Sequence, residues 1–578
     1  MHHDSLDLTA MSSTVPLSNF GESSNSDEFD LIELLLAEQQ SLTAVEKFSS
    51  LHESLVDDSP AQAKYYQDLL PATAPTPGQQ YAFQVDLDSC SGCKACVVAC
   101  HTMNGLDENE SWRRVGTISI GDGQQSRVQH VTTACHHCED PGCLNGCPVK
   151  AYTKDPETGI VRHLDDQCIG CKYCTMMCPY EVPQYSDRLG IVRKCDMCHQ
   201  RLKVGEAPAC VQSCPNEAIS IGLVETGNEP DSEHRLAAGA PVSAITKPST
   251  TYKTSHKYSV ANATPQDIGI DQAAENHWPL AVMLVATQVA VGMLLAERVA
   301  AFMMWTTGSL IPIEATRINV LAALVIAGVG MNFAPLHLGQ PLRAWRVFLG
   351  LRTSWLSREA IVLGKFVGLL FATVALYWLP VFGSHLPDWV SELVPVWAGS
   401  AMLLMAVVAG LVGLFSSGMI YVATKRQLWR FKRTMIRFFG TAITCGTAIA
   451  AAAMIHAGTP VSTVSLLLVT SFLTQFSKLH WEWRIHLGPT WDEDDEYDRR
   501  SRRLVEEQLA NWRTDRLFCG VVSLLLLTIG ALAAIFAAPG LAMIVVAASG
   551  LMMLAGELSE RLLYFSSVVY DRMPGTLR

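Results

Sequence analysis

The strongest constraint on this 578-residue chain is the placement of its cysteines, sixteen of which form four groups of four in the first half. Two groups have the spacing C-x2-C-x2-C-x3-C, and the other two lengthen only the gap before the third cysteine. This spacing lets three thiolates from one loop reach three irons of a cubane, while the fourth points to the neighbouring cluster. Sixteen such thiolates predict four [4Fe-4S] clusters in two pairs. The groups are Cys90, Cys93, Cys96 and Cys100; Cys135, Cys138, Cys143 and Cys147; Cys168, Cys171, Cys174 and Cys178; and Cys195, Cys198, Cys210 and Cys214.

Zinc and disulfides are the alternatives for a cysteine-rich region. A zinc site uses two separated C-x2-C pairs and gives no reason for the recurring C-x3-C, which Pro follows in three groups. A disulfide framework is typical of small exported domains. Every group keeps all four cysteines, so no three-iron cluster is expected. Cys445 and Cys519 lie in apolar segments and are interpreted as inert core residues.

From Trp278 onward the sequence is a series of long apolar runs, which is typical of a polytopic membrane protein. Eight runs are long enough to span a bilayer: 278–303, 318–337, 359–381, 396–421, 435–456, 460–479, 517–538 and 541–560. The predicted fold class is therefore an α+β ferredoxin-like domain with four [4Fe-4S] clusters, followed by an all-α membrane bundle of about eight helices.

The cysteine groups also carry a family resemblance. Their order and gaps, with the phrases KACVVACH, TTACHHCEDPGC, DDQCIGCKYC and RKCDMCHQR, closely resemble the four-cluster electron-transfer subunit of dimethyl sulfoxide reductase-type molybdenum enzymes, from Tyr81 to Gly222. The resemblance implies a nested pairing, the first group with the fourth and the second with the third. The implied ligand sets are Cys90, Cys93, Cys96 and Cys214; Cys195, Cys198, Cys210 and Cys100; Cys135, Cys138, Cys143 and Cys178; and Cys168, Cys171, Cys174 and Cys147.

Four regions are predicted along the chain: an acidic, partly disordered region with short helices (1–80), the cluster domain (81–225), a polar linker (226–275) and the membrane anchor (276–578). Residues 29–55 have a helical pattern, interpreted as a surface helix pair or a docking segment for a partner. The first 80 residues carry thirteen Asp or Glu against Lys47 and Lys64, and acidity confined to a tail gives no reason to expect nucleic-acid binding. Lys47 is the first basic residue, so neither a secretory signal nor a twin-arginine pair is expected at the N-terminus.

Basic residues predict the orientation of the anchor. With eight spans, twenty-one Lys or Arg fall on the side of the cluster domain, against Arg298 and Arg317 on the other side. The positive-inside rule then places the iron–sulfur domain on the cytoplasmic side of the bacterial inner membrane. The family resemblance implies the periplasmic side, because the best-known dimethyl sulfoxide reductases are exported with a partner's twin-arginine signal. We give the charge count of this sequence more weight.

A second resemblance concerns the membrane half. The phrases HLGQPLRAW, SWLSRE and AGELSERLLYF are similar to the membrane anchor subunit that accompanies such iron–sulfur subunits and oxidises quinol, so two subunits are fused in this chain. Quinol oxidation needs an apolar slot and groups that accept protons from two hydroxyls, for which a His and a carboxylate are suited. His337 ends the second segment and Glu359 opens the third, and ionisable residues at membrane depth are functional candidates.

Arg343 and Arg346 are further candidates for binding quinol, with anchoring to lipid headgroups as the alternative. Glu557 and Lys365 are secondary candidates. No haem is expected, because a haem would need paired histidines facing each other within different helices, and the histidines here lie mostly at segment ends or in loops.

We interpret the chain as the electron-transfer and membrane-anchor subunit of a molybdopterin oxidoreductase. Electrons would pass from membrane quinol through the clusters to a separate catalytic subunit of the dimethyl sulfoxide reductase or nitrate reductase kind. Two alternatives stay open. The path could run in reverse, as quinone reduction fed by a partner that oxidises formate or a sulfur compound. The chain could also be a non-catalytic anchor or transporter with structural clusters.

Overall fold

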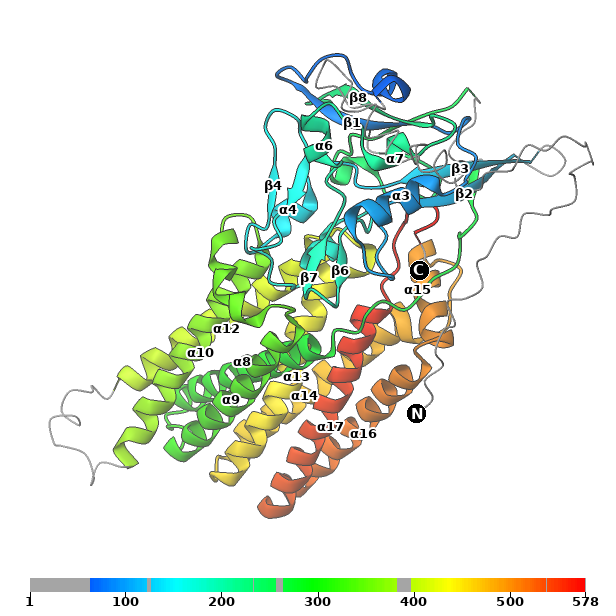
Figure 1. The fold of residues 1–578 in the computed structure, drawn as a ribbon. Helices are drawn as coiled ribbons and strands as arrows, with labels where there is room; N and C mark the ends of the chain where they lie inside the picture. The colour runs from blue at the N-terminus through cyan, green and yellow to red at the C-terminus, as the bar shows by residue number, and fades with distance from the viewer. Residues whose placement is uncertain are drawn as a thin grey trace, which may run out of the picture. The chain divides into compact units, whose positions relative to one another are not determined.

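The fold is taken from a computed structural model, which describes residues 63–121, 126–231, 233–255, 263–381, 397–536 and 538–576. The predicted helical region 29–55 lies outside the described residues. The chain divides into two compact units, and the second extends from Lys64 to Arg578. After two 3-10 turns (η1, Ala63–Tyr65; η2, Gln67–Leu69), this unit contains an α+β domain and a helical bundle, as the fold class predicted (Figure 1).

Two three-stranded sheets form the frame of the α+β domain. In the first, β1 (Gln79–Asp86) lies between antiparallel β8 (Ile219–Glu225) and parallel β9 (Thr251–Lys253). In the second, β2 (Arg114–Ile120) lies between β10 (Ala263–Pro265) and β3 (Arg127–Thr133), both antiparallel. The segment interpreted as a polar linker thus supplies an edge strand to each sheet. Two hairpins complete the domain: β4 (Tyr152–Lys154) with β5 (Val161–His163), and β6 (Gln184–Ser186) with β7 (Ile191–Arg193).

Short helices begin within each cysteine group. They are α3 (Ala95–Asn104), α4 (Gly142–Gly146), α5 (Tyr173–Met177), and α6 (His199–Lys203) with α7 (Ala209–Gln212), followed by the 3-10 turn η4 (Ser243–Ile245). Helix α3 of the first group packs against α7 of the fourth, and α4 of the second group packs against α5 of the third. This arrangement brings the cysteine groups together in the nested order that the resemblance implied.

Eight long helices of the described residues form the bundle. They are α8 (Trp278–Thr306), α9 (Ile313–Phe333), α10 (Trp355–Trp378), α12 (Ala398–Val422), α13 (Phe431–His456), α14 (Val461–Glu482), α16 (Ala510–Ile535) and α17 (Pro539–Ser566). Seven of these are long and apolar enough to cross a membrane, and α14 is the exception within the part of the chain that the structure describes. The remaining pieces are η6 (Ala334–His337), η7 (Pro341–Gly350), η9 (Gln427–Trp429), the π-helical turn η10 (Trp483–Leu487) and α15 (Glu496–Glu507).

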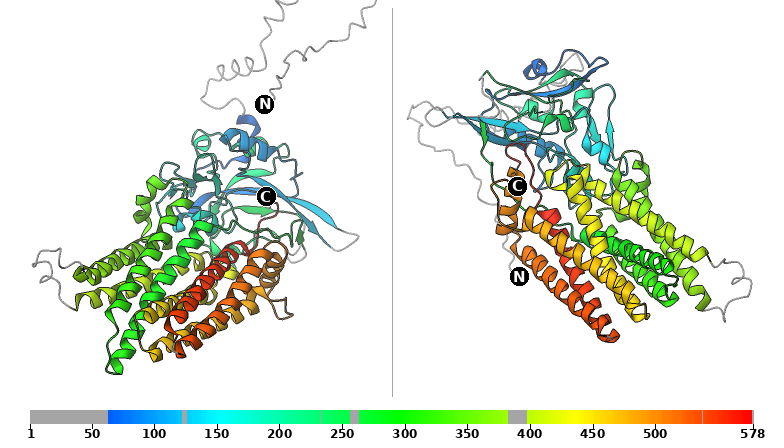
Figure 2. Two further views of the ribbon diagram at one scale, coloured as in Figure 1. Left: turned by 90° about the horizontal axis from the view of Figure 1, so that it is seen from below. Right: turned by 180° about the vertical axis from the view of Figure 1, so that it is seen from behind.

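The long helices pack in pairs across the bundle. Helix α14 packs against α13 and α16, while α8 packs against α9 and α13, α10 against α12, and α16 against α17 (Figure 2). Small residues permit the closest of these contacts: a Cβ on Gly292 of α8 would lie 1.8 Å from the carbonyl oxygen of Ala442 in α13. The outer faces expose large apolar side chains such as Phe371, Val408 and Leu525, as lipid contact requires.

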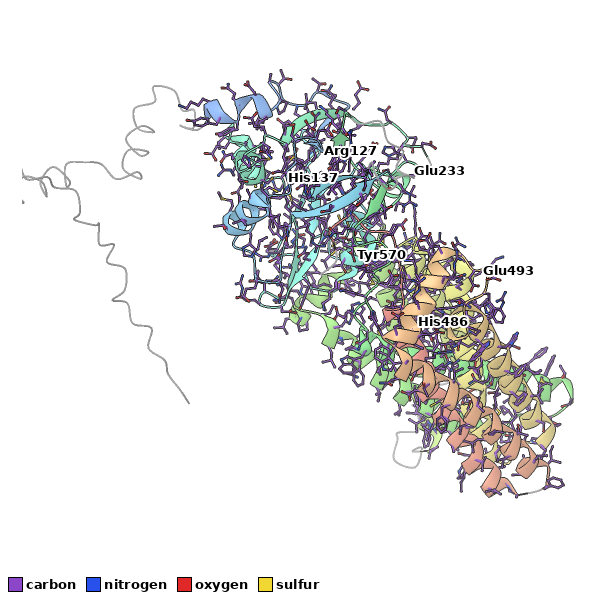
Figure 3. The ribbon with its side chains drawn as sticks, turned by 90° about the vertical axis from the view of Figure 1, so that its right-hand side faces the viewer. Arg127, His137, Glu233, His486, Glu493 and Tyr570 are labelled. Carbon is purple, nitrogen blue, oxygen red and sulfur yellow. The ribbon has the colours of Figure 1, made fainter. Side chains whose placement is uncertain are left out.

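The α+β domain rests on one end of the bundle. The backbone N–H of Gln340 donates to the carbonyl oxygen of Ile169 at 3.0 Å, and the Tyr173 hydroxyl donates to the carbonyl of Ile420 at 2.9 Å. The C-terminal tail returns to the same domain, where Tyr570 at the junction donates to Glu181 (Figure 3). The bundle therefore begins and ends on the side of the α+β domain.

A buried ionic cluster lies in the bundle near this end. It contains four cations and three carboxylates, all at most 4% exposed: Arg437, Lys478, Arg516, Arg561, Glu482, Glu557 and Glu560. Arg516 donates to both oxygens of Glu482, at 2.7 and 3.0 Å. The four cations are inside the protein and do not belong to membrane-flanking loops. Removing them from the count leaves seventeen basic residues on the side of the cluster domain against two on the opposite side. The predicted charge asymmetry between the two sides therefore persists.

Candidate iron–sulfur and quinol sites

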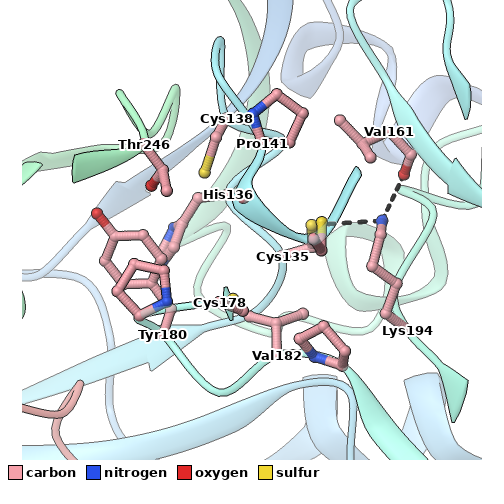
Figure 4. A pocket seen from close by; sticks show the side chains of 14 residues that line it. Cys135, His136, Cys138, Pro141, Val161, Cys178, Tyr180, Val182, Lys194 and Thr246 are labelled. Atoms are coloured by element: carbon pink, nitrogen blue, oxygen red, sulfur yellow. Dashed lines mark hydrogen bonds between the residues drawn. The ribbon is translucent and has the colours of Figure 1, made fainter. Parts of the chain in front are cut away.

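Two cavities in the α+β domain are lined by four cysteines each. One is lined by Cys135, Cys138, Cys143 and Cys178 (Figure 4), and the other by Cys90, Cys93, Cys96 and Cys214. Each set takes three cysteines from one group and the last cysteine from its partner group. The remaining thiols fall within electrostatic range of one another in the same way, Cys100 beside Cys198 and Cys210, and Cys147 beside Cys168 and Cys171.

The same backbone shape recurs in all four groups. The residue before each second cysteine has a left-handed conformation, with φ of 71° at Gly92, 41° at His137, 68° at Gly170 and 61° at Met197. This turn directs the N–H of His137, Gly170 and Met197 toward the sulfur of the cysteine two residues earlier, at 3.4 to 3.5 Å. Backbone donors toward cysteine sulfur are one means by which a protein holds and tunes an iron–sulfur cluster.

The donor set fits [4Fe-4S] clusters. Burial raises the pKa of the Cys100 thiol to about 12 and that of the Cys147 thiol to about 11, so a protein without metal holds these groups as neutral thiols. Binding of a cluster would favour the deprotonated form of these cysteines, because a metal ligand must be a thiolate. Sixteen cysteines in four such sets are consistent with four clusters.

Two buried cations lie among these thiols, and sequence reasoning missed both. Lys194 Nζ lies 3.5 Å from Cys135 Sγ and donates to the carbonyl oxygens of Val161 and Cys195 (Figure 4). Burial lowers the pKa of Lys194, but the nearby cysteine sulfurs outweigh it and hold the pKa above its usual value. Arg113, 2% exposed, lies within electrostatic range of the cysteines at 96, 100, 195 and 210. Lys194 directly precedes Cys195, which is a signal that could have indicated it, whereas nothing in the local sequence singles out Arg113.

The HLGQPLRAW segment docks on the third cysteine group. Gly339 packs against the domain so closely that a Cβ there would lie 2.0 Å from the carbonyl oxygen of Gly190. The guanidinium of Arg343 donates to the carbonyl oxygen of Cys168 at 3.3 Å, and Arg346 donates to that of Asp166 at 2.6 Å. The two arginines therefore hold the cysteine loop, and their predicted quinol contact stays a prediction.

His337 and Glu359 are each within electrostatic range of one of two consecutive residues of that loop. The half-buried His337 is within electrostatic range of Lys172, and its buried Nδ1 has no hydrogen-bond partner among the described residues. The buried Glu359 of α10 accepts a hydrogen bond from Ser417 of α12 and is within electrostatic range of Tyr173. Both candidate groups are thus within electrostatic range of the loop that carries Cys171 and Cys174.

The secondary candidates lie elsewhere. Glu557 belongs to the buried ionic cluster, where it pairs with Arg516 at 3.0 Å and with Lys478. Lys365 is exposed on the outer face of α10. Cys445 is fully buried in the bundle core.

The fold and these sites define a class: a multi-pass membrane protein that carries an iron–sulfur electron-transfer domain. Two family models agree, "4Fe-4S dicluster domain" over residues 126–224 and "DMSO reductase anchor subunit (DmsC)" over residues 272–482.

Curated relatives specify the family further. The protein is 37% identical over 182 residues to the B subunit of the anaerobic dimethyl sulfoxide reductase of Escherichia coli K12, covering 30% of this chain and 88% of that protein. It is 33% identical over 184 residues to the B subunit of the corresponding reductase of Haemophilus influenzae, covering 30% and 89%. The formate dehydrogenase-O iron-sulfur subunit of Escherichia coli K12 is 34% identical over 164 residues, covering 26% and 55%. The chain belongs to the dimethyl sulfoxide reductase iron–sulfur subunit family, fused to the membrane anchor of the same system.

Proposed function

We propose that this protein transfers electrons from membrane quinol to a separate molybdopterin-containing catalytic subunit. Membership of the family makes it an electron-transfer and membrane-anchor subunit of a dimethyl sulfoxide reductase-like complex. Bound [4Fe-4S] clusters supply one-electron transfer over the distance between the membrane and the partner. The protein's own part is to bind quinol, accept its protons and hold the cluster loops against the membrane bundle.

One observation carries the proposal. The loop of Cys171 to Cys174 inserts Tyr173 into the bundle, where its hydroxyl reaches Ile420 of α12 and its ring packs in the bundle core. His337 is within electrostatic range of Lys172, and Glu359 is within electrostatic range of Tyr173. Groups suited to accept quinol protons are therefore near the loop that carries two thiols of one cluster site. A structural anchor would need no such arrangement.

We assign distinct roles to the four candidate residues. His337 is the proposed proton acceptor, because its Nδ1 is buried without a hydrogen-bond partner in the described part of the chain. Glu359 is the proposed second acceptor, held by Ser417. Arg343 and Arg346 are proposed to fix the cluster loop over the quinol site through its carbonyl oxygens.

The direct test is anaerobic reduction by quinol. We expect the full-length protein, purified with its copurifying partner, to contain four clusters and to be reduced spectroscopically by added quinol. His337→Gln should slow this reduction by roughly 100-fold or more, the scale of a lost general base. His456→Gln is the matched control, because His456 is an exposed histidine at the end of α13. Zinc in place of iron, or reduction unaffected by His337→Gln, would refute the proposal.

The reverse direction is the second candidate, and it has support of its own. The formate dehydrogenase-O iron-sulfur subunit is also a relative of this chain, at 34% identity. Cluster potentials decide the direction, and they follow from local charge and hydrogen bonding. Clusters that quinol cannot reduce but that a formate- or sulfur-oxidising partner reduces would favour this direction.

We place the iron–sulfur domain on the cytoplasmic side. Sixteen Lys or Arg residues of the described part of the chain, outside the buried cluster, flank the bundle at the end of this domain, against Arg298 and Arg317 at the other end. A membrane-impermeant protease added to intact cells with permeabilised outer membranes should leave the 480–516 region uncut. Cleavage there would place the domain in the periplasm.

A further inference from the structure

A polar cavity of about 280 Å³ lies between the α+β domain and the bundle, close to the proposed quinol site. Its lining includes Lys172 of the cluster loop, Glu275 and His277 from the chain entering α8, and Arg426 between α12 and α13. A cavity of this size and polarity holds several water molecules. Nothing in the electron-transfer role requires a wet, charged cavity at this position.

His277 links this cavity to the proposed quinol site. It lines the cavity and is within electrostatic range of His337. The left-handed backbone of His277, with φ of 45°, caps α8 and places its ring edge-on to Phe565, 5.8 Å between centroids. Its Nδ1 lies 3.8 Å from Glu275 Oε1, a separation that one water molecule can bridge.

We propose that His277 and Glu275 carry the proton that His337 accepts in quinol oxidation to the water of this cavity. The inference rests on the proposed quinol oxidation. Conversion of one quinol to quinone breaks two O–H bonds; the two electrons enter the iron–sulfur domain singly, and His337 and Glu359 accept one proton each. His277 receives the proton of His337 and passes it to Glu275 and the cavity. His277 acts through His337 and is a positioning residue for proton release.

The charges around His277 suit a relay. Burial lowers its pKa, partly offset by Glu275, while Lys172 and Arg426 lower it further. His277 is therefore neutral near pH 7 and able to receive a proton. Glu275 is held in place by Lys172, at 2.8 and 2.9 Å, and its side chain is 57% exposed toward water. The groups facing His277 are thus Glu275, Lys172, Arg426 and His337.

The fusion of the two subunits contributes to this route. Glu275 lies in the segment that joins the α+β domain to the bundle, and the backbone of its neighbour Ala274 donates to the carbonyl of Ser566 at 3.1 Å. The segment that joins the two fused subunits therefore fixes the position of Glu275 relative to both the α+β domain and the bundle.

The test uses the full-length complex and a water-soluble quinol analogue. We expect His277→Gln and Glu275→Gln each to slow reduction of the iron–sulfur domain about tenfold, with unchanged affinity for the analogue and a larger solvent deuterium isotope effect. Imidazole should restore the rate of His277→Gly. Glu229→Gln is the control, since Glu229 is an exposed acid of the same segment that pairs with Lys247.

The outcomes separate this inference from the proposed function. If His337→Gln abolishes quinol oxidation while His277→Gln and Glu275→Gln keep the wild-type rate and isotope effect, the relay is overturned and the quinol site stands. Lost affinity without an isotope effect or imidazole rescue would show a structural role and would also overturn the relay. If the unaltered complex does not oxidise quinol, the proposed function fails.

Discussion

Replacing Lys194 with methionine should lower the reduction potential of the adjacent cluster. The ammonium lies 3.5 Å from Cys135 Sγ and is 2% exposed, so water screens it little. Removing a positive charge disfavours the added electron, which fixes the sign of the shift.

The magnitude follows from Coulomb's law. A unit charge at this separation interacts by about 5 kcal/mol at an effective dielectric constant of about 20. The added electron is spread over a cluster that extends beyond the sulfur, so about half of this energy remains. For a one-electron couple, about 59 mV corresponds to a tenfold change in the equilibrium constant. We therefore expect a downward shift of roughly 100 mV.

The assay is a redox titration of the purified full-length protein followed by electron paramagnetic resonance. Lys203→Met is the matched control, because Lys203 is an exposed lysine of the same domain. Lys194 also donates to two carbonyl oxygens, so the variant loses thermal stability, and iron content is measured in parallel. A variant with full iron content and all potentials within about 20 mV of the wild type would refute the reasoning.

The buried charges, the docked HLGQPLRAW segment and the buried cysteine thiols can each be tested. Arg516→Met leaves Glu482 buried without its bidentate partner and should destabilise the bundle by about 3 to 5 kcal/mol. The measurement is the melting temperature in detergent, which should fall. Arg513→Met, at a partly exposed position, is the control and should change the melting temperature little. Gly339→Ala places a Cβ against the carbonyl of Gly190 and should slow electron entry from quinol with iron content preserved. Gly364→Ala is the control, because a Cβ there has nothing within 4 Å, and it should leave the rate unchanged. Equal rates for the two variants would contradict the docking role of the HLGQPLRAW segment. Iron–sulfur reconstitution of the metal-free protein should release protons and weaken as the pH falls, because burial holds the Cys100 and Cys147 thiols protonated; pH-independent reconstitution would disagree.

The local features of this protein could be predicted because they are encoded by spacing and hydropathy. The C-x2-C pattern of Cys168 and Cys171 forces a turn, and the structure provides it with a left-handed residue at Gly170. The start of the last long helix at Pro539 also follows from local sequence, since Pro is accepted in the first turn of a helix. The fold class was correct for these reasons.

The roles of the charged residues could not be predicted in this way. The count of basic residues that predicted the orientation included Arg516 and Arg561 among the loop residues. Both are fully buried and paired with carboxylates. The segment 226–275 is polar along its length, and only pairing with β1 and β2 shows that it completes two sheets. Partners distant in sequence decide such roles.

Local sequence was enough to predict sixteen cluster cysteines, the membrane half and the position of HLGQPLRAW at a helix end, because each depends on residues close together in the chain. The tertiary structure alone shows that Lys194 lies beside Cys135, that Arg343 binds a cysteine loop, and that His277 lines a polar cavity within electrostatic range of His337. These contacts join segments separated by tens to hundreds of residues, and packing of the whole chain sets them.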